Sequence, residues 1–533
     1  MAIVLIGRGE RPASQLADEI GAKAANLARM VALGLPVPPA FVLPINLCAR
    51  ISAGDHDAER ELDEGLREGI NFLEHETGKR FGDRRRPLVV SVRSGAARAM
   101  PGMMATVLDV GTTSAAAAGL LRMTGNPRFA WDCRQRFIEG YATTVAGLDP
   151  GPFAGALAKI TDDEAVASPR DLDGEAMERL AVAYQAVAAR DDDWLEDPMR
   201  QLTGAARAVY ASWMSERAQT YRRLQELEQL RGTAVTVQAM VFGNRGLSSG
   251  AGVAFSRDPS TGEANPMIDV LFGAQGEEVV SGRRTPETEN AIARALPDVA
   301  AELRDVLHRM EREFGDIQDV EFTIEDGRLW LLQTRSAKRT PLAALRIALD
   351  LAREGVIAPC DALRQLADVD LDAIAHVRFD APGDPIARGT GASAGVATGR
   401  AVFDSGSAER LASDGEAVIL VRPDTSTDDV AGFAIATGIV TARGGRTAHA
   451  ALVARQMGKP SVVGCEHLTV DVEQRSARFA NAVVGEGEWI SIDGDSGAIY
   501  LGSRNIVRER PTAELEELLH LQQQAEPCPA SQG

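Results

Sequence analysis

A polar, proline-containing stretch that ends near Asp384 divides this chain into two blocks with different residue patterns. Before it, segments with strand-like and helix-like spacing follow one another over most of the chain, and after it short strands alternate with helices until about Leu501. A chain of 533 residues also exceeds what one hydrophobic core usually supports, so about two to four domains are expected. The pattern predicts a multidomain α/β and α+β protein.

The charge balance excludes several classes of partner. Lys and Arg number 57 against 76 Asp and Glu, a net charge of -19, which argues against a general affinity for nucleic acid or anionic membranes. No apolar run approaches the roughly 20 residues that span a bilayer, and the start "MAIVLIGRGE" lacks the layout of a secretory signal. The five cysteines form no CxxC pair. We therefore expect a cytoplasmic protein without nucleic-acid or membrane partners.

The first block opens with a helix and a small-residue loop. Apolar and small residues recur at helical spacing from Ile20 to Leu33, and Gly34 followed by prolines ends the helix. Further on, "RPLVVSVRSGAARAMPGMMATVL" predicts a strand ending at Arg93, a loop through Gly102 and a second strand. Such a loop lets backbone amides approach a ligand.

Later segments change from helical to strand spacing and back. Residues 162–230 are mostly helical by pattern, whereas "DIQDVEFTIEDGRLWLLQTR" predicts a β-hairpin that turns at Asp326 and Gly327. "TPLAALRIALDLAREGVI" is a further amphipathic helix. In the second block, "GVATGRAVF", "EAVILV" and "GIVTA" are predicted strands of a layered α/β unit.

One histidine stands at a chemically useful place. A strand, the Gly-Gly pair at 444–445 and a helix beginning near Thr447 put His449 in the first helical turn. The positive end of the helix dipole disfavours imidazolium and favours an anionic group on the ring, and Arg443 and Arg446 add positive charge. A lone histidine at a helix end is nevertheless more often packed or solvated than reactive.

The long segment around His449 resembles a known motif. "TARGGRTAHAALVARQMGKPSVVG" resembles the phosphohistidine motif of the enzymes that use phosphoenolpyruvate, and "ARGTGASAGVATGRAVF" resembles the start of their swivelling histidine domain. The resemblance implies that His449 is transiently phosphorylated. It also puts Thr447 at the position where one of these enzymes, the dikinase of plants, is regulated by phosphorylation.

The segments before residue 340 resemble pyruvate phosphate dikinases in the same order. They include "GAKAANLARMVALGLPVPPAF", "SVRSGAARAMPGMMATVL", "GTAVTVQAMVFGN", "GVAFSRDPSTGE" and "QDVEFTIEDGRLWLLQTRSAKRT". This resemblance implies an ATP-grasp nucleotide-binding domain, so neither a Walker A sequence nor a dinucleotide GxGxxG is needed. The implied organisation is an ATP-grasp domain at 1–345, a helical linker at 346–384, a swivelling β/α phosphohistidine domain at 385–503, and a helical remnant with a tail at 504–533.

The resemblance also assigns site residues for ATP and Mg²⁺. Asp319 lies two residues from Glu321 and so on the same face of a strand, which suits one metal site. Each residue alone has an ordinary structural explanation, such as a surface ion pair or a sheet hydrogen bond, and only their joint occurrence favours the site. The implied residues are His449, Arg93 and Arg335 for catalysis; Lys23, Arg93, Gly102, Thr106, Gln238, Glu321, Gln333 and Arg335 for ATP; and Asp319, Glu321 and Gln333 for Mg²⁺.

The chain departs from the family pattern in two ways. Full-length dikinases continue into a large barrel that binds pyruvate and phosphoenolpyruvate, whereas only about thirty residues follow the histidine domain here, so we expect this barrel to be absent. The dikinases also usually have Met and Ser where this chain has Arg446 and Ala448, and Arg446 is more like phosphoenolpyruvate synthase. The co-substrate is therefore either phosphate, as in the dikinase, or water, as in the synthase.

The leading hypothesis is a pyruvate phosphate dikinase-like phosphotransferase that converts ATP to AMP and phosphorylates His449. The phosphoryl group would pass to pyruvate on a separate barrel protein or to another small acceptor, as in the related antibiotic phosphotransferases. A non-catalytic, ATP-binding regulatory relative is the alternative from another class, and a phosphoenolpyruvate synthase-like enzyme and an inactive fragment are also open. The enzyme is favoured by the joint retention of Lys23, Arg93, Glu321, Gln333, Arg335 and His449.

Overall fold

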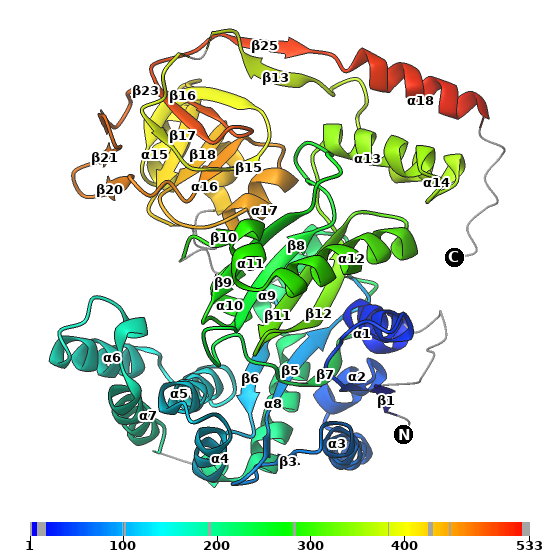
Figure 1. Ribbon diagram of the computed structural model, residues 1–533, viewed down its shortest axis with the longest axis vertical. Coiled ribbons are helices and arrows are strands. Elements are labelled where there is room, and N and C mark those ends of the chain that lie inside the picture. Colours follow the sequence, from blue (N-terminus) through cyan, green and yellow to red (C-terminus); the bar gives the residue numbers. More distant parts are fainter. Residues whose placement is uncertain are drawn as a thin grey trace. The chain divides into compact units, whose positions relative to one another are not determined.

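The chain forms two compact units. A computed structural model describes residues 3–7, 17–98, 100, 103–189, 193–280, 284–381, 383–424, 430–446 and 449–524. Unit 1 comprises Met1–Ser249 with Ile324–Thr334, and unit 2 comprises Gly250–Thr323 with Arg335–Gly533. Both units mix helices with sheets, which confirms a mixed α/β protein (Figure 1). No described helix has the length and apolar character that crossing a membrane requires.

Unit 1 is built on a five-stranded antiparallel sheet. Its strand order is β1-β2-β7-β5-β6, and every residue of β7 is buried because helices cover the sheet. The strands are β1 (Val4–Ile6), β2 (Ala40–Leu43), β5 (Val90–Gly95), β6 (Thr106–Val110) and β7 (Ala234–Ala239). Helices that pack on them include α1 (Ala17–Ala32), α3 (His56–Thr77) and α8 (Pro198–Ser212).

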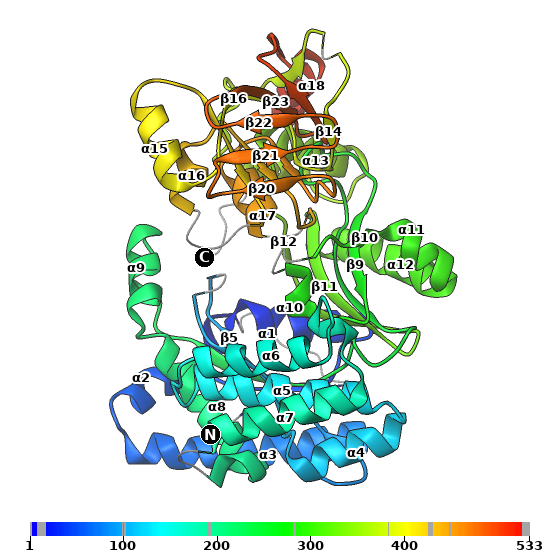
Figure 2. The same ribbon diagram turned by 90° about the vertical axis from the view of Figure 1, so that its left-hand side faces the viewer.

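The predicted helical segment at 162–230 is confirmed, and it belongs to a larger helical layer. In Figure 2, α5 (Pro127–Thr144) and α7 (Gly174–Ala188) lie side by side. Asn126 caps α5 by accepting from the Phe129 N–H, and Pro127 suits the first turn. Other helices of unit 1 are α2 (Asn46–Ser52), α4 (Ser114–Thr124), α6 (Gly151–Asp163) and α9 (Glu216–Leu224).

The second sheet contains the predicted hairpin. Its order is β10-β9-β8-β11-β12, and the turn between β11 and β12 has Asp326 at φ 49° and Gly327 at φ 76°, the left-handed pair that a two-residue hairpin turn favours. The strands are β8 (Gly250–Phe255), β9 (Met267–Phe272), β10 (Glu287–Thr288), β11 (Gln318–Glu325) and β12 (Arg328–Ser336). Three helices follow β9: α10 (Gly276–Val280), α11 (Glu289–Ala295) and α12 (Pro297–Phe314).

One chain segment leads from this sheet to the third, and the segment that follows the third sheet packs against it. The predicted amphipathic helix is α13 (Pro341–Arg353), which packs with α14 (Pro359–Gln365) and α18 (Thr512–Gln524) around Leu345 and Leu518. Beyond these helices, β13 (His376–Phe379) pairs antiparallel with β25 (Ile506–Glu509). The way into the third sheet and the way out therefore run next to each other.

The third sheet has eight strands in the order β14-β24-β23-β16-β17-β18-β19-β15. Strands β16 to β19 are parallel, and α15 (Ser405–Ser413), α16 (Val430–Ile435) and α17 (His449–Gln456) pack on them, which confirms the predicted layered unit. The strands are β14 (Ala387–Arg388), β15 (Thr390–Ser393), β16 (Val396–Val402), β17 (Val418–Arg422), β18 (Gly438–Thr441), β19 (Ser461–Val463), β23 (Trp489–Asp493) and β24 (Ala498–Leu501).

Candidate functional site

Unit 1 brings three of the predicted nucleotide residues to one face of its sheet. Arg93 on β5 lies directly opposite Thr106 on β6 and Thr236 on β7. Gln238 is two residues beyond Thr236 and therefore on the same face. The Arg93 and Thr106 positions are half-buried and exposed, respectively, so this part of the face is open to a ligand.

Gln333 joins this group through its side chain. The Arg93 guanidinium donates from Nη2 to Oε1 of Gln333 at 3.5 Å, although the two residues are 240 positions apart. Gln238 has a structural role as well, because its buried amide donates to the Pro38 carbonyl at 3.1 Å. The Arg93–Gln333 contact is thus the part of the predicted set that unit 1 assembles most directly.

Lys23 lies on α1 just after a break in that helix. Gly21 has φ 82°, and a Cβ at this position would lie 2.1 Å from the carbonyl oxygen of Gly95 at the end of β5. The Ala22 N–H donates to the carbonyl of Ala96 at 3.0 Å. The predicted helix from Ile20 is therefore confirmed, but the close contact that ties its start to β5 was not visible in the helical spacing.

Unit 2 pairs two further predicted residues. Nε of Arg335 donates to Oδ2 of Asp319 at 2.7 Å, and the Asp319 side chain is 3% exposed. Burial raises the pKa of the Asp319 carboxyl above its ordinary value, and Arg335 opposes this shift. Asp319 depends on Arg335 for its charge, because an isolated buried carboxylate is strongly disfavoured.

The predicted magnesium ligands are two carboxylates and one amide. Asp319 and Glu321 alternate on β11 and so point to the same face, and Glu321 is half-buried. Gln333 belongs to unit 1, two residues before Arg335 on β12. No cluster of three or more His, Cys, Asp or Glu side chains suited to a metal occurs in the described ranges.

The segment before His449 packs tightly against the second sheet. The predicted order of strand, Gly-Gly pair and helix is confirmed, since β18 ends at Thr441 and α17 begins at His449. A Cβ at Gly445 would lie 2.2 Å from Cγ of Pro286 and 2.7 Å from Oδ2 of Asp269, a residue of β9. Only glycine allows this approach. The His449 side chain and all of Thr447 and Gly102 lie outside the described residues.

The arginines around this segment have different roles. Arg443, predicted to supply charge, lies 3.9 Å from the Asp424 carboxylate, and its side chain is 61% exposed. Arg446 instead accepts a hydrogen bond at its carbonyl from Arg455. Arg455 is 1% exposed, and its guanidinium lies over the ring of Phe255. Arg455 and Phe255 were not singled out in the sequence, because a buried contact between distant segments leaves no local spacing signal.

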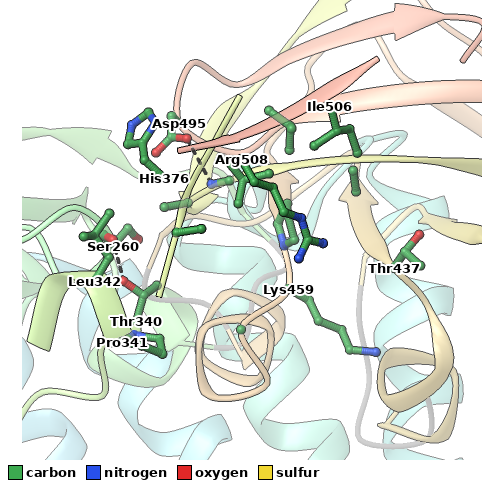
Figure 3. A pocket seen from close by; sticks show the side chains of 18 of the residues that line it. Ser260, Thr340, Pro341, Leu342, His376, Thr437, Lys459, Asp495, Ile506 and Arg508 are labelled. Carbon is green, nitrogen blue, oxygen red and sulfur yellow. Dashed lines mark hydrogen bonds between the residues drawn. The ribbon is translucent and has the colours of Figure 1, made fainter. Parts of the chain in front are cut away.

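A cavity of about 600 Å³ lies elsewhere in unit 2 (Figure 3). Ser260, Thr340, His376, Lys459 and Arg508 are among the residues that line it. None of the predicted site residues within the described ranges lines this cavity. The candidate site therefore consists of the sheet faces and the loop described above, and not of this hollow.

Two family models match the chain. The model described as "Pyruvate phosphate dikinase, AMP/ATP-binding domain" matches residues 58–295 and 287–354. The model described as "PEP-utilising enzyme, mobile domain" matches residues 415–497, which contain the Gly-Gly loop and α17. The two matches thus fall on the two parts of the chain that carry the candidate site.

Curated relatives agree with these models. A pyruvate, phosphate dikinase of Rhizobium meliloti is 43% identical over 508 residues, covering 91% of this chain and 56% of the relative. The enzyme of Clostridium symbiosum is 41% identical over 490 residues with the same coverage, and the chloroplastic enzyme 1 of Arabidopsis thaliana is 39% identical over 506 residues, covering 94% and 52%. The chain spans about half the length of these relatives. Because the first model covers more than half of its residues, the chain belongs to the pyruvate phosphate dikinase AMP/ATP-binding domain family.

Proposed function

We propose that this chain is an ATP-dependent phosphotransferase of the pyruvate phosphate dikinase type that uses His449 as the phosphoryl carrier. The observation that carries the proposal is the close contact of Gly445 with Pro286 and Asp269. Because of this contact, the loop before the His449 helix lies beside the second sheet within unit 2. The AMP/ATP-binding and mobile-domain matches support a nucleotide donor and a mobile carrier. We further propose that unit 1 and the second sheet form the ATP-grasp arrangement.

In the proposed reaction the His449 imidazole attacks the β-phosphorus of ATP. The bond from this phosphorus to the oxygen shared with the α-phosphorus breaks, and AMP leaves with that oxygen. The γ-phosphoryl group passes to inorganic phosphate, giving pyrophosphate, or to water, giving phosphate. One phosphoryl group then remains on His449. The carrier subsequently donates it to pyruvate, on a barrel of the same or a separate protein, or to another small acceptor.

The predicted site residues would supply positioning and charge for this transfer. Arg93 and Arg335 are proposed to neutralise phosphate oxygens, with Lys23, Gly102 and Thr106 along the triphosphate and Gln238 at the nucleotide. Asp319, Glu321 and Gln333 would hold Mg²⁺, which would supply positive charge to offset that of the phosphate groups. Arg335 keeps Asp319 ionised, which such a ligand requires.

Labelled ATP tests the proposal. The chain is incubated with Mg²⁺ and ATP labelled at the β-phosphate, with and without inorganic phosphate, and AMP, pyrophosphate and protein-bound label are measured. We expect acid-labile, base-stable label and equivalent AMP in the wild type and in His467→Ala, an exposed histidine of the same domain, and none in His449→Ala. Label that survives in His449→Ala, or a wild type unlabelled in both arms, would contradict the proposal.

The two arms also identify the co-substrate. Pyrophosphate formation that depends on added phosphate indicates the dikinase reaction, whereas labelling without phosphate and release of phosphate indicate the synthase reaction. The labelled protein is then mixed with pyruvate, alone or with a separately prepared barrel domain of a relative. Transfer of label to pyruvate in one of these mixtures assigns the acceptor. Retention of label on the chain in both favours another small acceptor.

A further inference from the structure

Arg455 is a buried cation six residues after His449 on the same helix. Its side chain is 1% exposed, and Nη1 has no hydrogen-bond partner in the described part of the chain. Burying an arginine costs free energy unless its guanidinium N–H groups, which give up their hydrogen bonds to water, find partners inside the protein. Its neighbours therefore indicate what the side chain does.

The guanidinium joins two backbone segments of the phosphohistidine part. Nε donates to the carbonyl of Ala392 on β15 at 2.8 Å, and Nη2 donates to the carbonyl of Arg446. Arg446 is the last described residue of the loop before α17. A single planar group thus fixes the end of the Gly-Gly loop relative to the sheet edge that supports it.

The same guanidinium also contacts the second sheet. Its central carbon lies 5.2 Å from the ring centroid of Phe255 on β8. The Ala392 carbonyl additionally accepts from Oγ of Ser260, just after β8, at 3.4 Å. Asp319, Asp258 and Asp269 attract the cation, although burial lowers the pKa of Arg455 to about 10, so the group stays charged at neutral pH.

We propose that Arg455 is a positioning residue that holds the loop before His449 in its phosphoryl-accepting geometry, and that stacking on Phe255 makes this geometry depend on contact with the second sheet. The inference rests on the proposed phosphotransfer and adds regulation of that site. When the mobile part leaves the sheet, the guanidinium loses the ring and the three carboxylates, so that only the hydrogen bonds to Ala392 and Arg446 remain and the plane of the group is held less firmly. His449 would then be poised for ATP only in the docked arrangement.

The substitution Arg455→Lys distinguishes a positioning role of the guanidinium from a simple requirement for positive charge. Arg455→Lys keeps the positive charge. An ammonium group, however, cannot donate to both carbonyls from one plane or stack a flat face on the Phe255 ring. We expect the single-turnover rate of His449 labelling from ATP to fall about 10- to 100-fold, with ATP affinity unchanged. Phe255→Leu should lower the same rate by about 3- to 30-fold. Arg410→Lys is the matched control, since Arg410 is exposed and pairs with Glu486 in the same domain.

Hydrogen exchange provides a readout that does not require phosphotransfer. Peptides covering residues 441–456 should exchange faster in Arg455→Lys and Phe255→Leu than in wild type and Arg410→Lys, with other peptides of unit 2 unchanged. Unchanged exchange in this segment overturns the proposal, and so does a uniform acceleration across unit 2, which would indicate a merely structural role. A rate that falls in Arg455→Lys but not in Phe255→Leu overturns the coupling to the sheet.

The two proposals fail in different ways. If the wild type takes no label, the proposed function fails, and the exchange comparison still decides whether Arg455 clamps the loop. If the wild type is labelled and Arg455→Lys is labelled at the wild-type rate, the positioning role fails while the phosphotransfer stands.

Discussion

Replacing Arg335 by methionine tests the pair that keeps Asp319 ionised. Removing one partner of a buried ion pair costs about 3–5 kcal/mol, because the other charge stays buried without compensation. Asp319 is 3% exposed, but the Arg335 side chain is 33% exposed, so water can enter the space that methionine leaves open. We therefore expect a loss of about 2–3 kcal/mol in the free energy of unfolding of unit 2 near pH 8.

This loss should depend on pH in a defined direction. Burial already raises the pKa of Asp319 above 3.8, and without Arg335 the pKa rises further. A carboxyl whose pKa is raised in the folded state contributes stability that is present below its unfolded pKa and is lost as the pH rises through its folded pKa. Each unit of the rise corresponds to about 1.4 kcal/mol. The variant should consequently lose less stability near pH 5 than near pH 8.

Urea unfolding at both pH values measures this effect. Hydrogen exchange of β11 is the reporter, since a chain of two units need not unfold in one step. The control is Asp319→Asn combined with Arg335→Met, which removes the titrating group and should abolish the pH difference. A loss below about 0.5 kcal/mol, or an equal loss at both pH values in Arg335→Met, would refute the reasoning.

Three further perturbations have simple expected outcomes. Arg257→Met leaves a buried glutamate without its cation and should cost about 3–5 kcal/mol in urea unfolding of unit 2, and a cost below 1 kcal/mol would show that the pair is dispensable. Gly445→Ala places a Cβ 2.2 Å from the ring of Pro286, so the rate of His449 labelling should fall at least about tenfold while ATP binding is retained. An unaffected labelling rate would contradict a role for the close contact between Gly445 and Pro286. Burial raises the pKa of Cys465 to about 11, whereas Cys360 is partly accessible, so iodoacetamide near pH 8 should modify Cys360 before Cys465, and modification of Cys465 first, in peptide mass spectrometry, would contradict this.

Local patterns predicted most of the elements. The Asp326–Gly327 dipeptide determines the hairpin turn by its backbone preference, and β16, β17 and β18 of the third sheet follow from apolar runs between turn residues. The Gly-Gly pair likewise predicted a helix with His449 in its first turn. These features depend on neighbours in the sequence, and for this reason a single sequence was enough to predict them.

Long-range packing was the part that local patterns could not provide. The break at Gly21 exists because its backbone meets the Gly95 carbonyl, yet in the sequence this glycine resembles an ordinary helical position. The Arg455–Phe255 stack joins residues two hundred positions apart, and nothing in either segment marks it. Assignment of Lys23 and the other site residues came from resemblance, and their roles stay predictions.

Site-resolved detection of phosphohistidine tests the central claim most directly. The chain is incubated with Mg²⁺, ATP and inorganic phosphate, digested under neutral to alkaline conditions, and its peptides are sequenced by mass spectrometry before and after brief acid treatment. We predict one added phosphoryl group on His449 that acid removes, accompanied by AMP and not ADP. An unmodified His449 peptide despite ATP turnover, or a phosphoryl group on another residue with ADP as product, would contradict the account.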